Sequence, residues 1–279
     1  MVGSARPAIE PRFVTVDGVD VRFAESESRD TDALLFAPWP ESLFAYDRVW
    51  SQLAERHHLI AVDLPGFGHS ERSDELLSPR AMGSFVNRLA DEFELEQPHA
   101  VAPDIGTAAV LFAAAEQPGR FLSLVVGTGG VAVPIDLGSP LRDWVFADDL
   151  EPYRDVDPRA FVGTALDTIR GYALPEDVRE DYLSGYDGDR FVESMRYVRA
   201  YPDELPALAE LLADIETPVQ IFAGGLDRVV PVANAEYLRE RLPHNRLDIL
   251  DTGHFAWEED ADEFAFMISD WWDGGYTAV

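Results

Sequence analysis

Short apolar runs alternate with amphipathic helical segments along most of this chain of 279 residues. A hairpin is predicted at 12–25, where apolar and polar residues alternate on both sides of Asp17-Gly18. Because strands that alternate with helices form parallel sheets covered on both faces, the sequence predicts an α/β fold with a mostly parallel central sheet flanked by helices. The expected strands are 33–37, 59–62, 121–127, 219–223 and 247–250, and the expected helices are 44–55, 79–94, 231–241 and 258–272.

The alternation stops near Gly129 and resumes only after residue 214. We therefore predict a core in two parts, residues 1–133 and 215–279, interrupted by a helical cap, or lid, at 134–214. Ligands of open α/β sheets bind beyond the carboxyl ends of the strands, so a lid inserted there would cover the site. The helices expected in the lid are 139–147, 157–170, 175–184, 188–200 and 202–213.

The segment at 99–115 changes from a short apolar run to an Ala-rich helical run at Asp104. A strand, a tight turn and a helix in this order lift one side chain above the sheet and aim it at the amino end of the helix. Backbone N–H groups there stabilise negative charge, and a carboxylate in this place can attack a saturated carbon to form an ester. Asp104 is therefore the predicted nucleophile. Asp is also a favoured N-cap residue, so a role limited to capping the helix at 105–116 stays open.

Two further acid–base residues follow late strands. Asp227 comes after the strand that ends at 223, and His254 comes after the strand at 247–250. Because the carboxyl ends of parallel strands lie at one edge of the sheet, we expect both side chains near Asp104. His254 would activate water and Asp227 would fix its tautomer, in the chain order nucleophile, acid, histidine. The alternatives are a turn or N-cap role for Asp227 and a loop role for His254.

The balance of charged residues indicates which classes of binding partner are unfavourable. The chain carries 52 Asp and Glu against 22 Lys and Arg, a formal net charge of −30, and every basic residue is Arg. Such a surface disfavours nucleic acid and anionic membranes as partners. It indicates either adaptation to high salt or an acidic protein in which Arg has replaced Lys. We expect a small-molecule substrate and leave a homodimer open.

The amino terminus and the cysteine count indicate the compartment. The chain has no Cys, no apolar leader segment and no run long enough to span a bilayer. We therefore expect a cytoplasmic protein without disulfides or thiolate metal sites, and we predict no cofactor and no metal.

Three motifs in this order resemble the α/β-hydrolase superfamily over nearly the whole chain. The segment at 63–70 (Asp-Leu-Pro-Gly-Phe-Gly-His-Ser) is similar to its Asp-x-x-Gly-x-Gly-x-Ser loop, and Gly253-His254-Phe255 resembles its catalytic histidine segment. An Asp at the elbow, followed here by Ile105-Gly106, resembles the epoxide hydrolase and haloalkane dehalogenase branch. The resemblance implies an α/β-hydrolase fold and hydrolysis through an ester on Asp104.

The loop at 37–40 (Ala-Pro-Trp-Pro) stands where that branch has His-Gly-x-Pro. The resemblance implies that the backbone N–H groups of Trp39 and Ile105 form the oxyanion hole. Pro40 matches the family pattern, whereas the usual His and Gly are replaced by Ala and Pro. Pro38 stiffens this loop, on which the direction of the Trp39 N–H depends.

The residues that handle the leaving group decide between epoxide and halide chemistry. Epoxide hydrolases use two cap tyrosines that donate to the ring oxygen, and Tyr153 and Tyr197 lie where that pattern places them. Either tyrosine can instead pack its ring within the lid. Haloalkane dehalogenases typically have a Trp directly after the nucleophile, where this chain has Ile105, so only the Trp39 indole is left to bind a halide.

Hydrolysis of an epoxide to a diol is therefore the favoured reaction. A haloalkane dehalogenase-like hydrolase and a non-catalytic ligand-binding protein on the same scaffold are the alternatives. The lid residues that indicate an apolar substrate are Trp144, Phe146 and Leu150.

Overall fold

A computed structural model describes residues 9–279 of the protein, which contain one eight-stranded sheet. Its strand order is β1-β2-β4-β3-β5-β6-β7-β8. The pairs β1–β2 and β2–β4 are antiparallel, and all later pairs in this order are parallel. The predicted α/β fold with a mostly parallel sheet is confirmed. The strands are β1 (Arg12–Val16), β2 (Val19–Glu25), β3 (Asp32–Phe36), β4 (His58–Val62), β5 (His99–Pro103), β6 (Ser123–Gly127), β7 (Val219–Gly224) and β8 (Asn245–Leu250).

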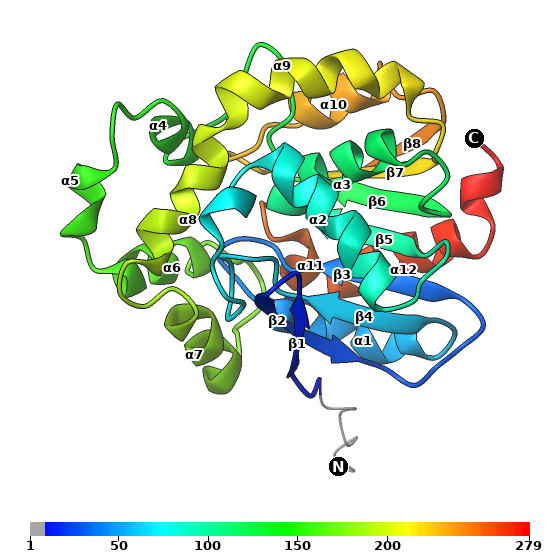
Figure 1. The fold of residues 1–279 in the computed structure, drawn as a ribbon, viewed down its shortest axis with the longest axis horizontal. Coiled ribbons are helices and arrows are strands. Elements are labelled where there is room, and N and C mark those ends of the chain that lie inside the picture. Colours follow the sequence, from blue (N-terminus) through cyan, green and yellow to red (C-terminus); the bar gives the residue numbers. More distant parts are fainter. Residues whose placement is uncertain (1–8) are drawn as a thin grey trace.

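Apolar side chains alternate between the two faces of the sheet, and helices cover both faces (Figure 1). In β5, Ala100 and Ala102 belong to the larger core cluster, whereas Val101 between them belongs to the second cluster. Helices α2 and α3 pack together over the first cluster, and α1 packs with α12 over the second. The helices of the core are η1 (Leu43–Tyr46), α1 (Asp47–Ala54), η2 (Asp74–Leu76), α2 (Pro79–Glu92), α3 (Ile105–Glu116), α10 (Ala233–Arg239), α11 (Ala256–Glu259), α12 (Ala261–Trp272) and η4 (Gly275–Thr277), while η3 (Leu212–Asp214) lies at the carboxyl end of the lid.

Local sequence signals explain the hairpin and one departure from the expected helices. Asp17 and Gly18 both have positive φ, 51° and 81°, as the tight turn of the predicted hairpin requires. The helix expected at 258–272 is instead divided into α11 and α12. Asp260 causes the division, because its backbone leaves the helical region and its side chain caps α12 by accepting the Glu263 N–H.

The lid helices lie between β6 and β7 in the chain. Figure 1 shows α4 to α8 grouped at one end of the sheet, at the left of that view. The five expected helices are present, and the short α5 between the first two was not expected, because a four-residue helix leaves too little periodicity to recognise. The lid helices are α4 (Leu141–Val145), α5 (Glu151–Arg154), α6 (Pro158–Leu166), α7 (Glu176–Ser184), α8 (Arg190–Arg199) and α9 (Tyr201–Leu211).

A buried ion cluster fixes helix α7 of the lid to the core. The Asp181 carboxylate accepts two hydrogen bonds from the Arg22 guanidinium, at 3.0 and 2.7 Å, and one from the Ser42 hydroxyl at 2.6 Å. Burial alone would raise the pKa of Asp181, but hydrogen bonds from His69, Arg22 and Ser42 hold it well below its usual range. Arg22 also lies 3.4 Å from the buried Asp63. This part of the lid is therefore held in place by charge-assisted bonds.

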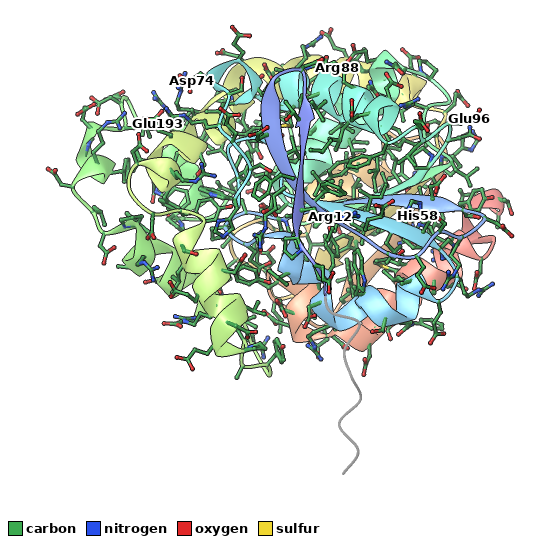
Figure 2. The ribbon with its side chains drawn as sticks, turned by 60° about the horizontal axis from the view of Figure 1, so that its bottom comes forward. Arg12, His58, Asp74, Arg88, Glu96 and Glu193 are labelled. Atoms are coloured by element: carbon green, nitrogen blue, oxygen red, sulfur yellow. The ribbon has the colours of Figure 1, made fainter. Side chains whose placement is uncertain are left out.

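The surface is dominated by acidic side chains, with arginines paired among them. Glu25 contacts both Arg12 and His58, at 2.5 and 3.0 Å, and Asp17 contacts Arg88 at 2.5 Å. Of the residues labelled in Figure 2, Arg12 is exposed and Arg88 is partly exposed, whereas His58 is buried. Exposed pairs of this kind contribute little to stability and leave most of the acidic charge uncompensated. Within residues 9–279, no helix combines the length and apolarity that a membrane crossing requires.

Candidate active site

Asp104 stands in a strained turn between β5 and α3. Its backbone has φ 52° and ψ −121°, a region that non-glycine residues rarely occupy. The turn is closed by hydrogen bonds from Asp104 N to Gly127 O at 2.9 Å and from Thr107 N to Asp104 O at 3.0 Å. Gly129 packs directly behind it, where a Cβ atom would lie 2.4 Å from Asp104 O. The Asp104 side chain makes no N-cap hydrogen bond to α3, so helix capping does not account for this residue.

Two backbone N–H groups reach the carboxylate of Asp104. The Trp39 N–H donates to Oδ2 at 2.8 Å, and the Ile105 N–H helps to lower the pKa of the carboxyl group. These are the two donors expected from the sequence. The Ala37-Pro38 pair in the loop therefore leaves the Trp39 N–H within reach of the acid.

His254 lies between the other carboxylate oxygen of Asp104 and Asp227. Its Nε2 is 3.7 Å from Asp104 Oδ1, and its Nδ1 is 2.8 Å from Asp227 Oδ2. The second oxygen of Asp227, Oδ1, accepts the N–H groups of Val229 at 2.7 Å and Val230 at 3.0 Å. Asp227 is thus a turn residue and a histidine partner at once, because one oxygen fixes its loop and leaves the other for the imidazole. The structure brings together all three residues that the sequence placed at strand ends.

Burial and neighbouring charges set the protonation of this pair. Burial raises the pKa of Asp104 above its ordinary value, and His254 and the two backbone N–H groups partly oppose that rise. Burial lowers the pKa of His254, but the charge and hydrogen bond of Asp227 and the charge of Asp104 outweigh it and raise the value to about 9. At neutral pH, His254 therefore carries a proton and faces the Asp104 carboxylate.

A cavity of about 380 Å³ opens onto Asp104 and His254. The rings of Trp39, Phe191 and Phe161 stack in succession along it, with 5.3 Å between the centroids of each neighbouring pair. Trp144 meets the Phe191 ring edge-on at 5.7 Å. This wall joins the oxyanion loop to three lid helices and suits an apolar substrate. The lid residues that line the cavity are Pro140, Leu141, Trp144, Phe161, Thr164, Ala165, Thr168 and Phe191.

Few polar groups along this cavity are free to donate a hydrogen bond. The hydroxyls of Thr164 and Thr168 already donate to the carbonyls of Ala160 and Ala165, both at 2.7 Å. The indole Nε1 of Trp39 is buried and has no hydrogen-bond partner. Asp104 and His254 are the only titratable residues among those that line the cavity.

The structure does not bring Tyr153 or Tyr197 to the cavity. Tyr197 is fully buried, and its hydroxyl donates to the carbonyl of Ile105 at 2.8 Å, while its ring meets the Phe67 ring edge-on at 5.5 Å. Tyr153 is half-buried against the main core cluster. Tyr197 therefore contacts the elbow through the Ile105 carbonyl and not through the cavity.

Of the three lid residues that indicated an apolar substrate, Trp144 lines the cavity. Leu150 is buried outside it, and Phe146 is 54% exposed. Phe146 follows the last residue of the short α4, whose buried side chains lie on the opposite face. Helix α6 supplies a wall that the sequence analysis missed. Its signal was available, because the residues concerned have the helical spacing i, i+3, i+4 and i+7, the last of them in the turn just after α6: Phe161, Thr164, Ala165 and Thr168.

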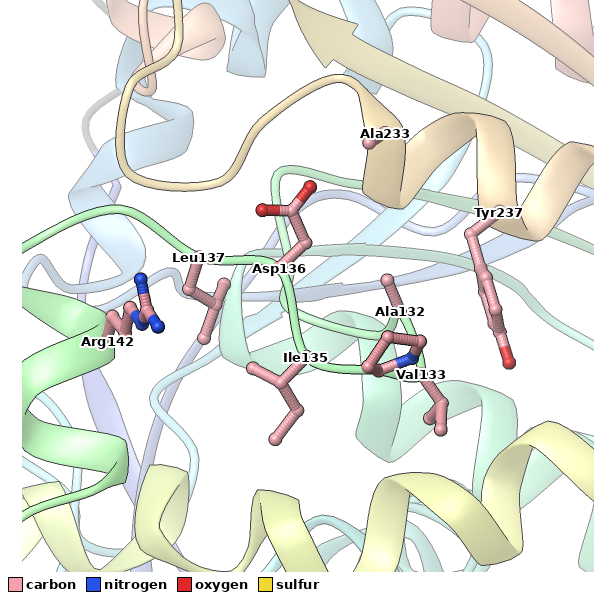
Figure 3. Close-up of a pocket in the computed structure, with 9 residues that line it drawn as sticks. Ala132, Val133, Ile135, Asp136, Leu137, Arg142, Ala233 and Tyr237 are labelled. Atoms are coloured by element: carbon pink, nitrogen blue, oxygen red, sulfur yellow. The ribbon is translucent and has the colours of Figure 1, made fainter.

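A second cavity, of about 480 Å³, lies where the chain leaves the core for the lid. Figure 3 shows its lining residues at 132–137 between Arg142 and Tyr237. It contains none of the three residues of the Asp104 site. In the part of the chain that the structure describes, no group of three or more His, Cys, Asp or Glu side chains is arranged to hold a metal ion.

Comparisons with known proteins identify the family of this fold. A family model described as alpha/beta hydrolase fold matches residues 39–261. An uncharacterized hydrolase of Saccharomyces cerevisiae is 25% identical over 264 residues, which cover 87% of this chain and 89% of the yeast protein. The 3-oxoadipate enol-lactonase 1 of Acinetobacter baylyi is 23% identical over 224 residues, covering 78% of this chain and 79% of the lactonase. The solved structure of the epoxide hydrolase CorEH is similar in fold, with a TM-score of 0.79 at 17% identity over 94% of this chain and 97% of that one.

Proposed function

The chain belongs to the alpha/beta hydrolase fold family, and we propose that it hydrolyses a small apolar epoxide to a diol through an ester formed on Asp104. The observation that carries this proposal is the carboxylate at the elbow. Its Oδ2 accepts the Trp39 N–H, while Oδ1 is the oxygen nearer to His254. A carboxylate is a poor nucleophile for esters and amides, and it is suited to displacement at a saturated carbon.

Ring opening needs a nucleophile and a proton. Asp104 Oδ1 attacks a ring carbon, the carbon–oxygen bond of the ring breaks, and its electron pair moves to the ring oxygen. We assign the proton that this oxygen takes up to His254, whose pKa of about 9 keeps it protonated at neutral pH. General acid assistance of this kind contributes roughly 10²- to 10⁴-fold to a rate.

Hydrolysis of the ester reuses the same groups. Ester formation neutralises Asp104. Because the charge of Asp104 is one cause of the high His254 pKa, its loss favours the neutral imidazole. It takes a proton from water, and the hydroxide attacks Cγ of Asp104, with the oxyanion held by the N–H groups of Trp39 and Ile105. The departing diol oxygen takes that proton from His254, and Asp104 returns its own proton to the imidazole. One water is consumed, and the site regains its starting protonation.

A second candidate, dehalogenation of a small alkyl halide, is favoured by one observation. The buried Trp39 indole N–H lacks a partner, and no tyrosine among residues 9–279 lines the cavity. A departing halide needs weak N–H donors and no proton, and Trp39 is a cavity-lining residue with an unpaired N–H. In that case His254 must release its proton to solvent before it can activate water.

Product identity separates the two candidates. The enzyme is incubated with apolar epoxides and with alkyl halides of matched carbon skeleton, and diol and free halide are quantified, with Asp104→Ala as the blank. We expect diol from at least one epoxide and none from the variant. Halide release without diol formation would establish the second candidate, and wild-type turnover by Asp104→Ala would overturn the ester mechanism for both.

A further inference from the structure

Glu41 is a fully buried carboxyl group on the loop that supplies an oxyanion donor. Glu41 follows Trp39 by two residues in the sequence. Its Oε2 accepts a hydrogen bond from the indole N–H of Trp257 at 2.6 Å. Trp257 comes three residues after His254, and the two rings are 6.3 Å apart. One hydrogen bond therefore connects the loop that carries the Trp39 N–H to helix α11, which begins two residues after His254.

The lid contacts both of these loops at the same place. The Tyr186 hydroxyl donates to the backbone carbonyl of Glu41 at 3.1 Å, and the Tyr182 hydroxyl donates to Oε1 of Glu258 at 3.1 Å. Glu258 follows Trp257 directly and is also buried. The Glu41–Trp257 bond is thus enclosed by the lid, out of contact with water.

The surroundings of Glu41 disfavour a negative charge. Its Oε1 is buried and has no hydrogen-bond partner, and no cation is among the groups that act on its ionisation. Burial raises the pKa of Glu41 well above its ordinary value, and the charges of Glu258 and Asp104 raise it further. The hydrogen bond from the Trp257 N–H lowers this pKa only in part. Glu258 itself has a pKa raised to about 7, mainly by burial. Arg48, which donates to the Glu258 carbonyl, lowers the pKa of Glu258 only in part.

We propose that Glu41 is a positioning residue, which fixes the position of the Trp39 loop relative to the His254 segment on either side of Asp104. We further propose that Glu41 does this as a neutral carboxylic acid. A neutral acid accepts the Trp257 N–H through its carbonyl oxygen and adds no second negative charge beside the nucleophile. The inference rests on the proposed function only in taking Asp104 and His254 as the reacting pair.

The His254 pKa, measured by NMR titration of its imidazole, tests both parts of the inference without substrate. Glu41→Gln keeps an acceptor for Trp257 and mimics a neutral acid, so we expect the His254 pKa to stay at about 9. Glu41→Ala removes the connection, so the contacts of His254 with its two acids loosen and its pKa falls toward the ordinary value of about 6.5. A lowered pKa in Glu41→Gln would show that Glu41 is ionised and overturn the neutral form. An unchanged pKa in Glu41→Ala would overturn the positioning role.

Trp257→Phe provides the same test if Glu41→Ala does not fold. It removes the N–H donor and keeps an aromatic ring, and we expect it to lower the His254 pKa as Glu41→Ala does. An unchanged value in Trp257→Phe would also overturn the positioning role.

With an epoxide that the wild type opens, Glu41→Ala should lower kcat by roughly tenfold to a hundredfold with little change in KM, because displaced catalytic groups slow the reaction. Glu41→Gln should restore most of it, and a Glu41→Gln variant as slow as Glu41→Ala would contradict the inference.

Discussion

His254 Nε2 lies 3.7 Å from Asp104 Oδ1, beyond hydrogen-bonding distance but close enough for an ion pair. The other ring nitrogen is held 2.8 Å from Asp227 Oδ2, so the imidazole cannot turn away. Oδ1 thereby keeps a lone pair free for attack, while the imidazolium stabilises the carboxylate.

The pH profile of kcat/KM for an epoxide should be bell-shaped. The acid limb reflects protonation of Asp104, and it should lie above the ordinary Asp range because burial raises the Asp104 pKa. The alkaline limb should fall near pH 9, where His254 loses the proton that ring opening requires. In Asp227→Asn this limb should move to lower pH, since Asp227 is a cause of the raised His254 pKa. An epoxide profile with no alkaline limb would contradict the assignment of the proton to His254.

His254→Gln should trap the ester on Asp104. The amide can hydrogen-bond but cannot take a proton from water, so hydrolysis should slow by orders of magnitude. Ring opening should also slow, because the variant lacks the donated proton, yet the intact mass should rise by one substrate mass on long incubation. Asp104→Ala should show no mass increase under the same conditions. A His254→Gln protein that never gains mass at saturating substrate would count against an ester intermediate.

Tyr197→Phe distinguishes two roles for this lid tyrosine. In the structure its hydroxyl donates to the Ile105 carbonyl, so its loss should lower the free energy of unfolding by about 1 kcal/mol. The rate of ester formation should change little, and Tyr153→Phe should serve as a control with an even smaller effect on stability. If Tyr197 instead protonates the ring oxygen, ester formation should slow by about tenfold or more in single-turnover experiments.

The strand-end residues were predictable because each carries a local signal. Asp104, Asp227 and His254 follow short apolar runs, and the geometry of a parallel sheet then places all three at one edge. The lid was less predictable, since helical periodicity shows which face is buried but not which partner covers it. Tyr197 illustrates this limit, because its buried face packs on Phe67 and Ile105 instead of on the cavity.

Glu41 was not predictable from the sequence at all. A glutamate directly after a proline in a loop ordinarily lies in water, and nothing nearby in the sequence marks it as buried. Its burial depends on Trp257, which lies 216 residues later in the chain, and on the lid that covers both. Long-range contacts of this kind are decided by tertiary packing.

The acidic surface should make thermal stability depend on salt. With a formal net charge of −30, repulsion between like charges opposes the compact state, and salt screens it with a Debye length of about 8 Å at physiological ionic strength. The melting temperature should therefore rise with sodium chloride in the sub-molar range. A flat or falling curve would show that repulsion does not limit stability and would remove the argument for adaptation to high salt.

The central claim is that water attacks an ester of Asp104 and not the substrate itself. Multiple turnovers of an epoxide in oxygen-18 water should place the label in the peptide that contains Asp104, because each hydrolysis at Cγ leaves a water oxygen on the carboxylate. In a single turnover, the diol should carry the former carboxylate oxygen and no label. Label in the diol after one turnover, with none in the Asp104 peptide after many, would contradict the account.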